Sequence, residues 1–103
     1  MFRRVRVQGD SMRPTLHDGE IRWSNRLLYR LRSPRRGEVV VVDHPSRPLR
    51  LIKRVVGVPG DTVDGCVLQA DEFFVRGDNP AASTDSDSFG AVARSRIVGR
   101  VRA

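Results

Sequence analysis

The chain alternates apolar and polar residues in short runs, and this period of two predicts β-strands. Val5 and Val7 alternate with polar residues and lead into a Gly-Asp turn, so the first strand is expected to deliver Ser11 at its end. The alternation returns at residues 21–24, after a turn at residues 17–20. The N-terminal part of the chain therefore predicts two strands joined by a segment that carries a serine.

A run of four valines at residues 39–42 predicts a further strand. No polar residue interrupts the run and charged residues flank it, so this strand is expected to be buried on both faces. Leu27, Leu28 and Leu31 have helical spacing instead, and residues 26–32 predict a short amphipathic helix or an exposed basic and apolar lobe. The other expected elements are strands at 49–58, 73–75 and 97–101, a small hairpin bracketed by turns at 59–61 and 64–65, a rigid loop at 44–48 and a polar loop at 80–90.

Together these elements predict an all-β fold, a compact single domain of coiled antiparallel sheets over residues 1–103. The sequence shows no internal repeat and no linker that would mark a second domain. No apolar run approaches the roughly 20 residues that span a bilayer, and the N-terminus lacks the apolar core of a signal peptide. The chain as given is therefore expected to be soluble.

The charge is distributed unevenly along the chain. Residues 1–54 carry a formal charge of +9 and residues 55–103 a charge of −2, so the net charge is +7. A basic half could bind nucleic acid or make weak contact with an anionic membrane surface. Only Phe2, Trp23 and Tyr29 lie among the arginines, which are few rings for stacking single-stranded bases. We therefore expect no nucleic-acid partner, and a basic nucleic-acid-binding β domain stays as the non-enzyme alternative.

Cysteine and histidine are scarce. Cys66 is the only cysteine, so no internal disulfide can form, and its apolar, strand-like surroundings predict a buried structural thiol. One cysteine with His17 and His44 does not make a zinc set, and we expect neither a metal nor another cofactor. A Ser–His–Asp enzyme using either histidine stays open as an alternative, although neither histidine lies in a recognisable triad context.

Lys53 is the single lysine beside eighteen arginines. Arginine keeps its proton inside a protein, whereas a desolvated lysine can lose it and act as a general base. Lys53 lies in a run of Leu, Ile and Val, and this context indicates a buried neutral amine whose pKa is lowered by desolvation. With Ser11 in its turn before Met12 and Pro14, the sequence predicts a serine nucleophile activated by a lysine base. The alternative is a residual surface lysine in an arginine-rich chain.

Four stretches of the chain resemble the conserved boxes of the signal peptidase I family. Residues 11–16, Ser-Met-Arg-Pro-Thr-Leu, resemble the serine box, and residues 36–41 resemble the strand box that follows it. Residues 53–61 resemble the lysine box, and residues 77–92, which begin Gly-Asp-Asn, resemble the last box. The four boxes occur in the family's order and cover nearly the whole chain. The resemblance implies the β fold shared by signal peptidases and self-cleaving repressors, as one peptidase domain.

The resemblance also implies a role for each matching residue. Ser11 would attack the scissile carbonyl, and neutral Lys53 would take the serine proton and return it to the leaving amine. Ser83 would orient the lysine amine through a hydrogen bond, and Met12 would line the pocket for the residue before the cut. Gly9 stands where many bacterial relatives carry a hydroxyl that donates to the oxyanion, so the Ser11 N–H is the one donor assigned.

Arg54, Asp78 and Asp85 are expected to support this site structurally. In the family, an arginine usually stands two residues after the aspartate that Asp85 matches, and this chain has Asp87 there. The usual Asp–Arg pair is therefore missing from the last box. We expect Asp85 to pair with Arg54 instead.

The implied activity is that of a serine endopeptidase that removes an N-terminal extension or signal peptide from a precursor protein or peptide. A short chain with no anchor, a His44-Pro45 loop and a Gly-Asp-Asn-Pro stretch at 77–80 is most similar to cytoplasmic proteases that mature nickel-type superoxide dismutase. A minimal signal peptidase, membrane-associated if a natural anchor has been removed, is the alternative within the family. Self-cleaving repressor peptidases also combine a Gly-Asp-Ser-Met turn with a later lysine, but they lack the Pro-Thr-Leu continuation and the last box.

Overall fold

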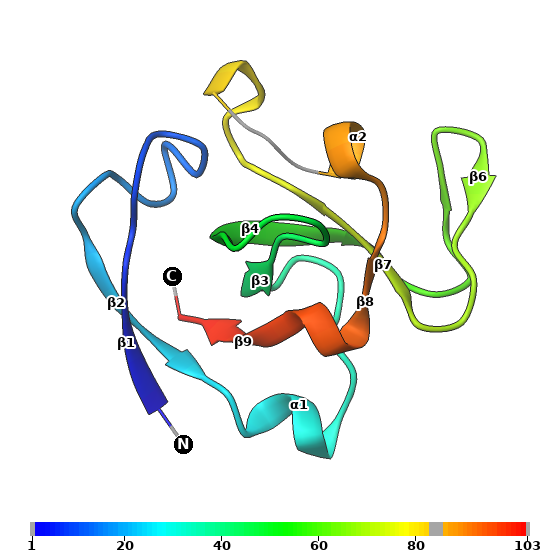
Figure 1. The fold of residues 1–103 in the computed structure, drawn as a ribbon, viewed down its shortest axis with the longest axis horizontal. Coiled ribbons are helices and arrows are strands. Elements are labelled where there is room, and N and C mark those ends of the chain that lie inside the picture. Colours follow the sequence, from blue (N-terminus) through cyan, green and yellow to red (C-terminus); the bar gives the residue numbers. More distant parts are fainter. Residues whose placement is uncertain (1, 83–85, 103) are drawn as a thin grey trace.

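The computed structural model describes residues 2–82 and 86–102, and most of its strands form one antiparallel sheet. The strand order is β1-β2-β9-β3-β4-β7-β8, and the sheet curls into half a barrel with β1 and β2 on one side and β4 and β7 on the other (Figure 1). The strands are β1 (Phe2–Arg6), β2 (Ile21–Asn25), β3 (Val39–Asp43), β4 (Arg50–Gly57), β7 (Glu72–Arg76), β8 (Val92–Ala93) and β9 (Ile97–Val101). The expected all-β fold is confirmed.

Short elements complete the described part of the chain. Two two-residue strands, β5 (Thr62–Val63) and β6 (Cys66–Val67), form a separate hairpin. The helical elements are α1 (Leu28–Leu31), η1 (Pro80–Ala82), α2 (Ser86–Phe89) and η2 (Arg94–Arg96). Among the described residues, none of these helices is long and apolar enough to cross a membrane.

Strand β3 separates two hydrophobic clusters. All four of its valines are buried, as the sequence predicted, and successive side chains of a strand point to opposite faces. Val40 and Val42 join a cluster with residues of β4, β7 and β8. Val39 and Val41 join the other cluster, which holds the residues Val7, Met12, Leu16 and Val101. The second cluster therefore anchors the segment that carries Ser11.

Three expectations change in the structure. Residues 80–90 are not simply a loop, since η1 and α2 lie within them and the buried Ser86 Oγ accepts a hydrogen bond from the Val75 N–H at 2.9 Å. Residues 26–32 form one helical turn that buries Tyr29 but leaves Leu31 exposed, so both expectations hold in part. Cys66 is exposed, and the prediction of a buried thiol is wrong.

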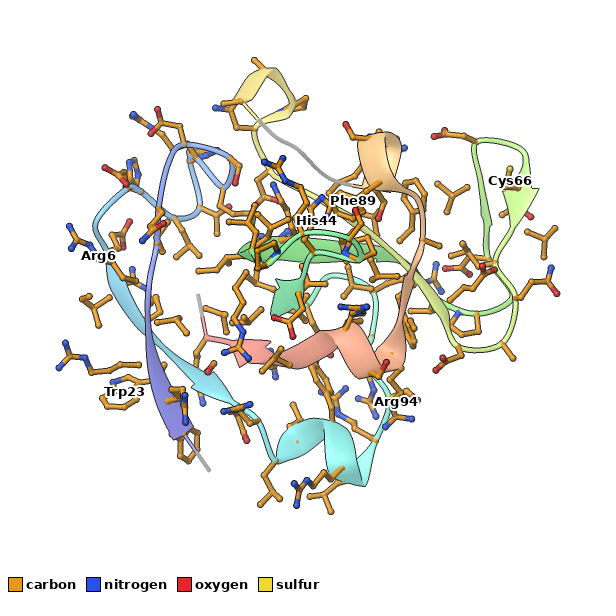
Figure 2. The ribbon with its side chains drawn as sticks, viewed as in Figure 1. Arg6, Trp23, His44, Cys66, Phe89 and Arg94 are labelled. Carbon is orange, nitrogen blue, oxygen red and sulfur yellow. The ribbon has the colours of Figure 1, made fainter. Side chains whose placement is uncertain are left out.

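The exposure of Cys66 follows from the geometry of its hairpin. Asp64 and Gly65 both have positive φ and form a tight turn between β5 and β6. This two-stranded hairpin stands to one side of the main sheet, with Cys66 near its tip (Figure 2). Four paired residues cannot bury both faces of a strand, so Cys66 and Val67 face solvent, whereas Leu68 after them is buried.

Glu38, just before β3, is the centre of a buried polar cluster. Its carboxylate accepts hydrogen bonds from the Tyr29 hydroxyl at 2.9 Å, the Arg35 N–H at 2.9 Å and the Arg32 guanidinium at 3.1 Å. Burial by itself raises the pKa of Glu38, but these hydrogen bonds outweigh burial and lower the pKa to about 2. Burial, together with the hydrogen bond to Glu38, raises the pKa of Tyr29.

The hydrogen bonds of Glu38 predict that part of the free energy of unfolding is lost in acid. Because the folded-state pKa of Glu38 lies below the ordinary value of 4.5, its stabilising contribution is complete above about pH 4.5 and is lost as the pH falls toward 2. Glu38→Gln should lower the free energy of unfolding at pH 7 by about 2 kcal/mol, since it removes the charged acceptor of the Arg32 hydrogen bonds. Urea unfolding between pH 2 and 7, at roughly unit intervals, would measure this, with a flatter acid limb expected in the variant. Asp71→Asn, at an exposed turn, is the control, and equal losses in both variants would contradict the prediction.

Candidate active site

Ser11 lies in the segment between β1 and β2, and both ends of this segment are fixed. The Gly9 N–H donates to Asp18 Oδ1 at 2.8 Å, and Gly9 has a φ of +79°, which a side chain would strain. The Leu16 N–H donates to the Met12 carbonyl at 2.9 Å. Met12 and Leu16 are almost completely buried, whereas Ser11 is only partly buried. Met12 and Leu16 thus anchor the segment in the hydrophobic core, while Ser11 stays partly accessible to solvent.

Residues of the loop after β7 form hydrogen bonds with this serine segment. The Asn79 N–H donates to the Ser11 carbonyl at 2.8 Å, and Asn79 Nδ2 donates to the Asp10 carbonyl at 3.0 Å. The Thr15 hydroxyl donates to Asp78 Oδ2 at 2.6 Å. The sequence analysis assigned no role to Asn79 or Thr15. Thr15 lies in the serine box and Asn79 in the last box, and these positions could have indicated a role because the fold brings the two boxes together.

Arg54 of β4 connects this loop to the centre of the sheet. Its Nε and Nη2 donate to the two carboxylate oxygens of Asp78 at 2.9 and 2.8 Å, and its Nη1 donates to the Gly37 carbonyl at 2.7 Å. The hydrogen bonds from Arg54 lower the pKa of Asp78, against the opposing effect of burial. Asp78 is thus a partner of Arg54. Asp85, for which we expected that pairing, and Ser83 lie outside the described residues.

Lys53 precedes Arg54 on β4 and is buried, with 2% of its surface exposed. The alternative of a residual surface lysine is therefore wrong. Lys53 is paired with Val40 of β3 and lies two residues before Val55, and both valines are fully buried. Residues directly opposite each other in an antiparallel pair share a face, so the lysine stem lies on the apolar face of β4. Burial of this kind disfavours the charged form of an amine.

A groove of about 570 Å³ runs along β1 and ends at Ser11. Residues 3–8 form one wall, residues 48–52 form the other, and Ser11, Met12 and Val41 are among the residues that line the space between them. Strand β1 is the last strand of the sheet on this side, so within the described residues its outer edge pairs with no strand. An unpaired edge presents backbone N–H and C=O groups to whatever enters the groove.

Not all of the predicted site residues meet in this groove. Ser11 and Met12 line it, Gly9 flanks it in sequence, and Lys53 is not among its lining residues. His17 is exposed, and His44 is buried with its ring 4.9 Å from that of Phe89 (Figure 2). Neither histidine lines the groove, so its geometry gives no support to a Ser–His–Asp arrangement. Among the described residues, no group of three or more His, Cys, Asp or Glu could hold a metal ion.

A curled antiparallel sheet, with a serine at the end of a groove along its edge strand, places this protein in the all-β class. Comparison with known families agrees with this class. The family model described as signal peptidase, peptidase S26, matches residues 1–66 and 64–103. The chain belongs to this family.

Curated relatives carry names from the same family. A mitochondrial ATP-independent inner membrane protease subunit 1b from Arabidopsis thaliana is 39% identical over 90% of this chain and 63% of its own length. Signal peptidase I of Leptolyngbya laminosa is 32% identical over 91% of this chain and 64% of its own length. Signal peptidase I of Bacillus licheniformis is 34% identical over 75% of this chain and 40% of its own length. The chain thus spans less than two thirds of each of these relatives.

Proposed function

We propose that this chain is a serine endopeptidase in which Ser11 is the nucleophile and Lys53 is the general base. The observation that carries the proposal is the burial of the one lysine on β4, directly before Arg54, whose partner Asp78 accepts a hydrogen bond from Thr15 of the serine segment. A surface lysine would be protonated near neutral pH, whereas burial among apolar side chains favours the neutral amine that a base requires. The membership of the signal peptidase family supports the same assignment.

In the first half of the reaction, the Ser11 Oγ attacks the carbonyl carbon of the scissile peptide bond. Its proton passes to the Lys53 amine, and the Ser11 N–H donates to the developing oxyanion. Breakdown of the tetrahedral intermediate moves that proton from Lys53 to the leaving amine and leaves an acyl-enzyme. In the second half, water gives a proton to Lys53 and attacks the ester, and Ser11 regains its proton.

The remaining predicted residues have supporting roles in this proposal. Ser83 orients the Lys53 amine, as its match to the family's last box suggests. Met12 is buried beside Ser11 and lines the groove, where it limits the size of the residue before the cut. Gly9 carries no side chain, so it adds no hydroxyl to the oxyanion site. The Arg54–Asp78 pair and Asp85 hold the last box against the serine segment.

The substrate binds as an extended strand along the free edge of β1. Consecutive residues of β1 line the groove, which means that the strand presents its edge as well as its inner face. Backbone hydrogen bonds to this edge would hold a peptide in register independently of its sequence. Such binding places successive side chains alternately toward the groove floor and away from it. The scissile bond then lies at the groove's end, beside Ser11.

We infer further that the substrate is a precursor with an N-terminal extension, and that this extension is of the nickel-type superoxide dismutase kind. Purified chain should cleave a dismutase-type extension at physiological salt without detergent, after a small residue such as Ala or Gly. The same assay should be run with a secretory preprotein, each substrate with and without anionic vesicles. Cleavage of the preprotein alone, and only with vesicles, would show a membrane signal peptidase. Thiol reagents are the control, since Cys66 lies outside the groove lining.

A further inference from the structure

The end of the groove farthest from Ser11 is rich in arginine. Arg3 of β1, Arg26 just after β2 and Arg50 of β4 line it, and no aspartate or glutamate among the described residues does so. A second hollow of about 490 Å³ shares Arg26 and Arg50 with the groove and adds Arg30 and Asp43. Asp43 forms an ion pair with Arg50 at 2.8 Å. The groove end and the second hollow together thus contain four arginines, Arg3, Arg26, Arg30 and Arg50, and one carboxylate.

The strand register shows which of these arginines face the groove. Arg3 lies on the same face of β1 as Val5 and Val7, and its register partner on β2 is the buried Ser24, two residues before Arg26. Arg50 lies on the same face of β4 as Ile52, which packs against the cluster that contains Val7. Arg3, Arg26 and Arg50 therefore share the inner face of the curled sheet with the groove's apolar lining.

Arg4 and Arg6 have the opposite orientation. They alternate with Arg3 and Val5 along β1 and pair with the exposed Trp23 and Ile21 of β2. Figure 2 draws Arg6 and Trp23 on the outer side of β1 and β2, away from β3 and β4. These two arginines border the groove only along the strand edge, which makes them a matched control on the same strand.

We propose that the arginine end of the groove, formed by Arg3, Arg26 and Arg50, binds an acidic side chain of the substrate. This proposal rests on the proposed function and names a sequence preference within it. Among the described residues, Arg3 and Arg26 make no ion pair, so their charge is available to a carboxylate. Guanidinium groups on low-dielectric walls attract an anion more strongly than the same groups on an open surface.

The length of β1 sets the distance of this carboxylate from the scissile bond. From Gln8, which lines the groove near Ser11, to Arg3 is five residues, or about 16 Å at the rise of a β-strand. An added substrate strand has the same rise. The preferred Asp or Glu thus lies four to six residues from the cut, on the side that runs along β1.

A peptide is a better occupant of this groove than a nucleic acid. Within the described part of the chain, no aromatic residue lines the groove, whereas sites for single-stranded nucleic acid stack bases on aromatic rings. The apolar residues Val5, Val41 and Ile52 line the same groove, and they suit alternate side chains of an extended peptide. A carboxylate among several guanidinium groups is a common form of specific recognition.

The test is binding of fluorescent peptides to the Ser11→Ala variant of the full chain, which separates recognition from cleavage. The peptides share Ala residues around the cut and carry a single Glu, Gln or Lys at each position from two to seven residues away, on either side. A Glu four to six residues away on one side should bind about tenfold more tightly than Gln, and Lys more weakly than Gln. The preference should disappear near roughly 0.5 M salt, where exposed charges are screened.

Two matched double variants test whether the arginines on the inner face of the sheet cause the preference for Glu over Gln. Arg3→Gln/Arg26→Gln should remove the preference for Glu, and Arg4→Gln/Arg6→Gln should keep most of it, although both lose the same charge. Equal binding of Glu and Gln peptides at every position at low salt would overturn the proposal, as would equal losses in the two double variants. Anionic vesicles or an oligo-dT that bind through Arg3 and Arg26, while Glu peptides bind no better than Gln, would also overturn it.

Cleavage by the unmodified chain separates this proposal from the proposed function. Cleavage of Glu, Gln and Lys peptides with equal kcat/KM would overturn the acidic preference and leave the endopeptidase standing. Selective binding of Glu peptides by Ser11→Ala, with no peptide cleaved by the unmodified chain, would contradict the proposed endopeptidase function and support the carboxylate-binding site. An acidic preference in both binding and kcat/KM would support both.

Discussion

Replacing Ser11 with alanine, or Lys53 with arginine, should each abolish peptide cleavage. Without the hydroxyl no acyl-enzyme can form, and a guanidinium in place of the amine cannot accept the serine proton. Each loss in kcat should be about 10⁴-fold or more, and combining the two changes should cost little beyond either one, since groups that act as a unit are not additive. Single-turnover cleavage of a fluorogenic precursor peptide would measure these losses.

The buried site of Lys53 calls for a second substitution, because arginine is larger and could disturb the packing around Val40 and Val55. Lys53→Met keeps nearly the length of the side chain without an amine to desolvate, and its melting temperature should equal or exceed that of the unmodified chain. It should be as inactive as Lys53→Arg. Turnover within tenfold of the unmodified rate in a folded Lys53→Met variant would remove Lys53 from the mechanism.

Replacing Asp78 with alanine should lower kcat about 100-fold while changing KM little. Asp78 joins Arg54 of β4 to Thr15 of the serine segment, so its loss frees the segment to move relative to the strand that carries Lys53. A displacement near 1 Å between reacting groups can cost about 10²-fold in rate. Steady-state kinetics on one peptide, together with thermal unfolding, would give both parts of the result.

Two other aspartate variants separate positioning from general destabilisation. Asp78→Asn can still accept the Thr15 hydrogen bond but loses the ion pair with Arg54, so its kcat should fall between those of the unmodified chain and Asp78→Ala. Asp64→Ala removes an exposed ion pair with Arg76 near the β5–β6 hairpin and should leave kcat unchanged. A kcat for Asp78→Ala equal to that of Asp64→Ala would show that the Asp78 contacts do not position the serine.

The strands could be predicted from the sequence because their signals are local. The four valines of β3 have no polar neighbour within the run, and such a run is stable only where both faces are covered. The burial of Lys53 could be predicted in the same way, from the run of Leu, Ile and Val around it. The assignment of Ser11 and Lys53 as nucleophile and base stays a prediction until the variants are measured.

Contacts between distant parts of the chain could not be predicted in this way. Asn79 and Ser11 are 68 residues apart in the sequence, and no local pattern of either segment specifies that the loop after β7 returns to the serine. Asp78 was expected to support the site, but its partner Arg54 follows from the pairing of β4 with β7. Pairings of this kind depend on register across the sheet, which is set by the whole fold.

Local sequence patterns are enough to predict the all-β class, the buried β3 and the burial of Lys53, because each depends on the side chains within a few neighbouring residues. The exposure of Cys66 depends on the folded arrangement, since the same apolar run suits a buried strand or a small hairpin standing outside the sheet. The fold likewise places Arg3, Arg26 and Arg50 at one end of a groove. These three residues come from three separate parts of the chain, and the curl of the sheet brings them together.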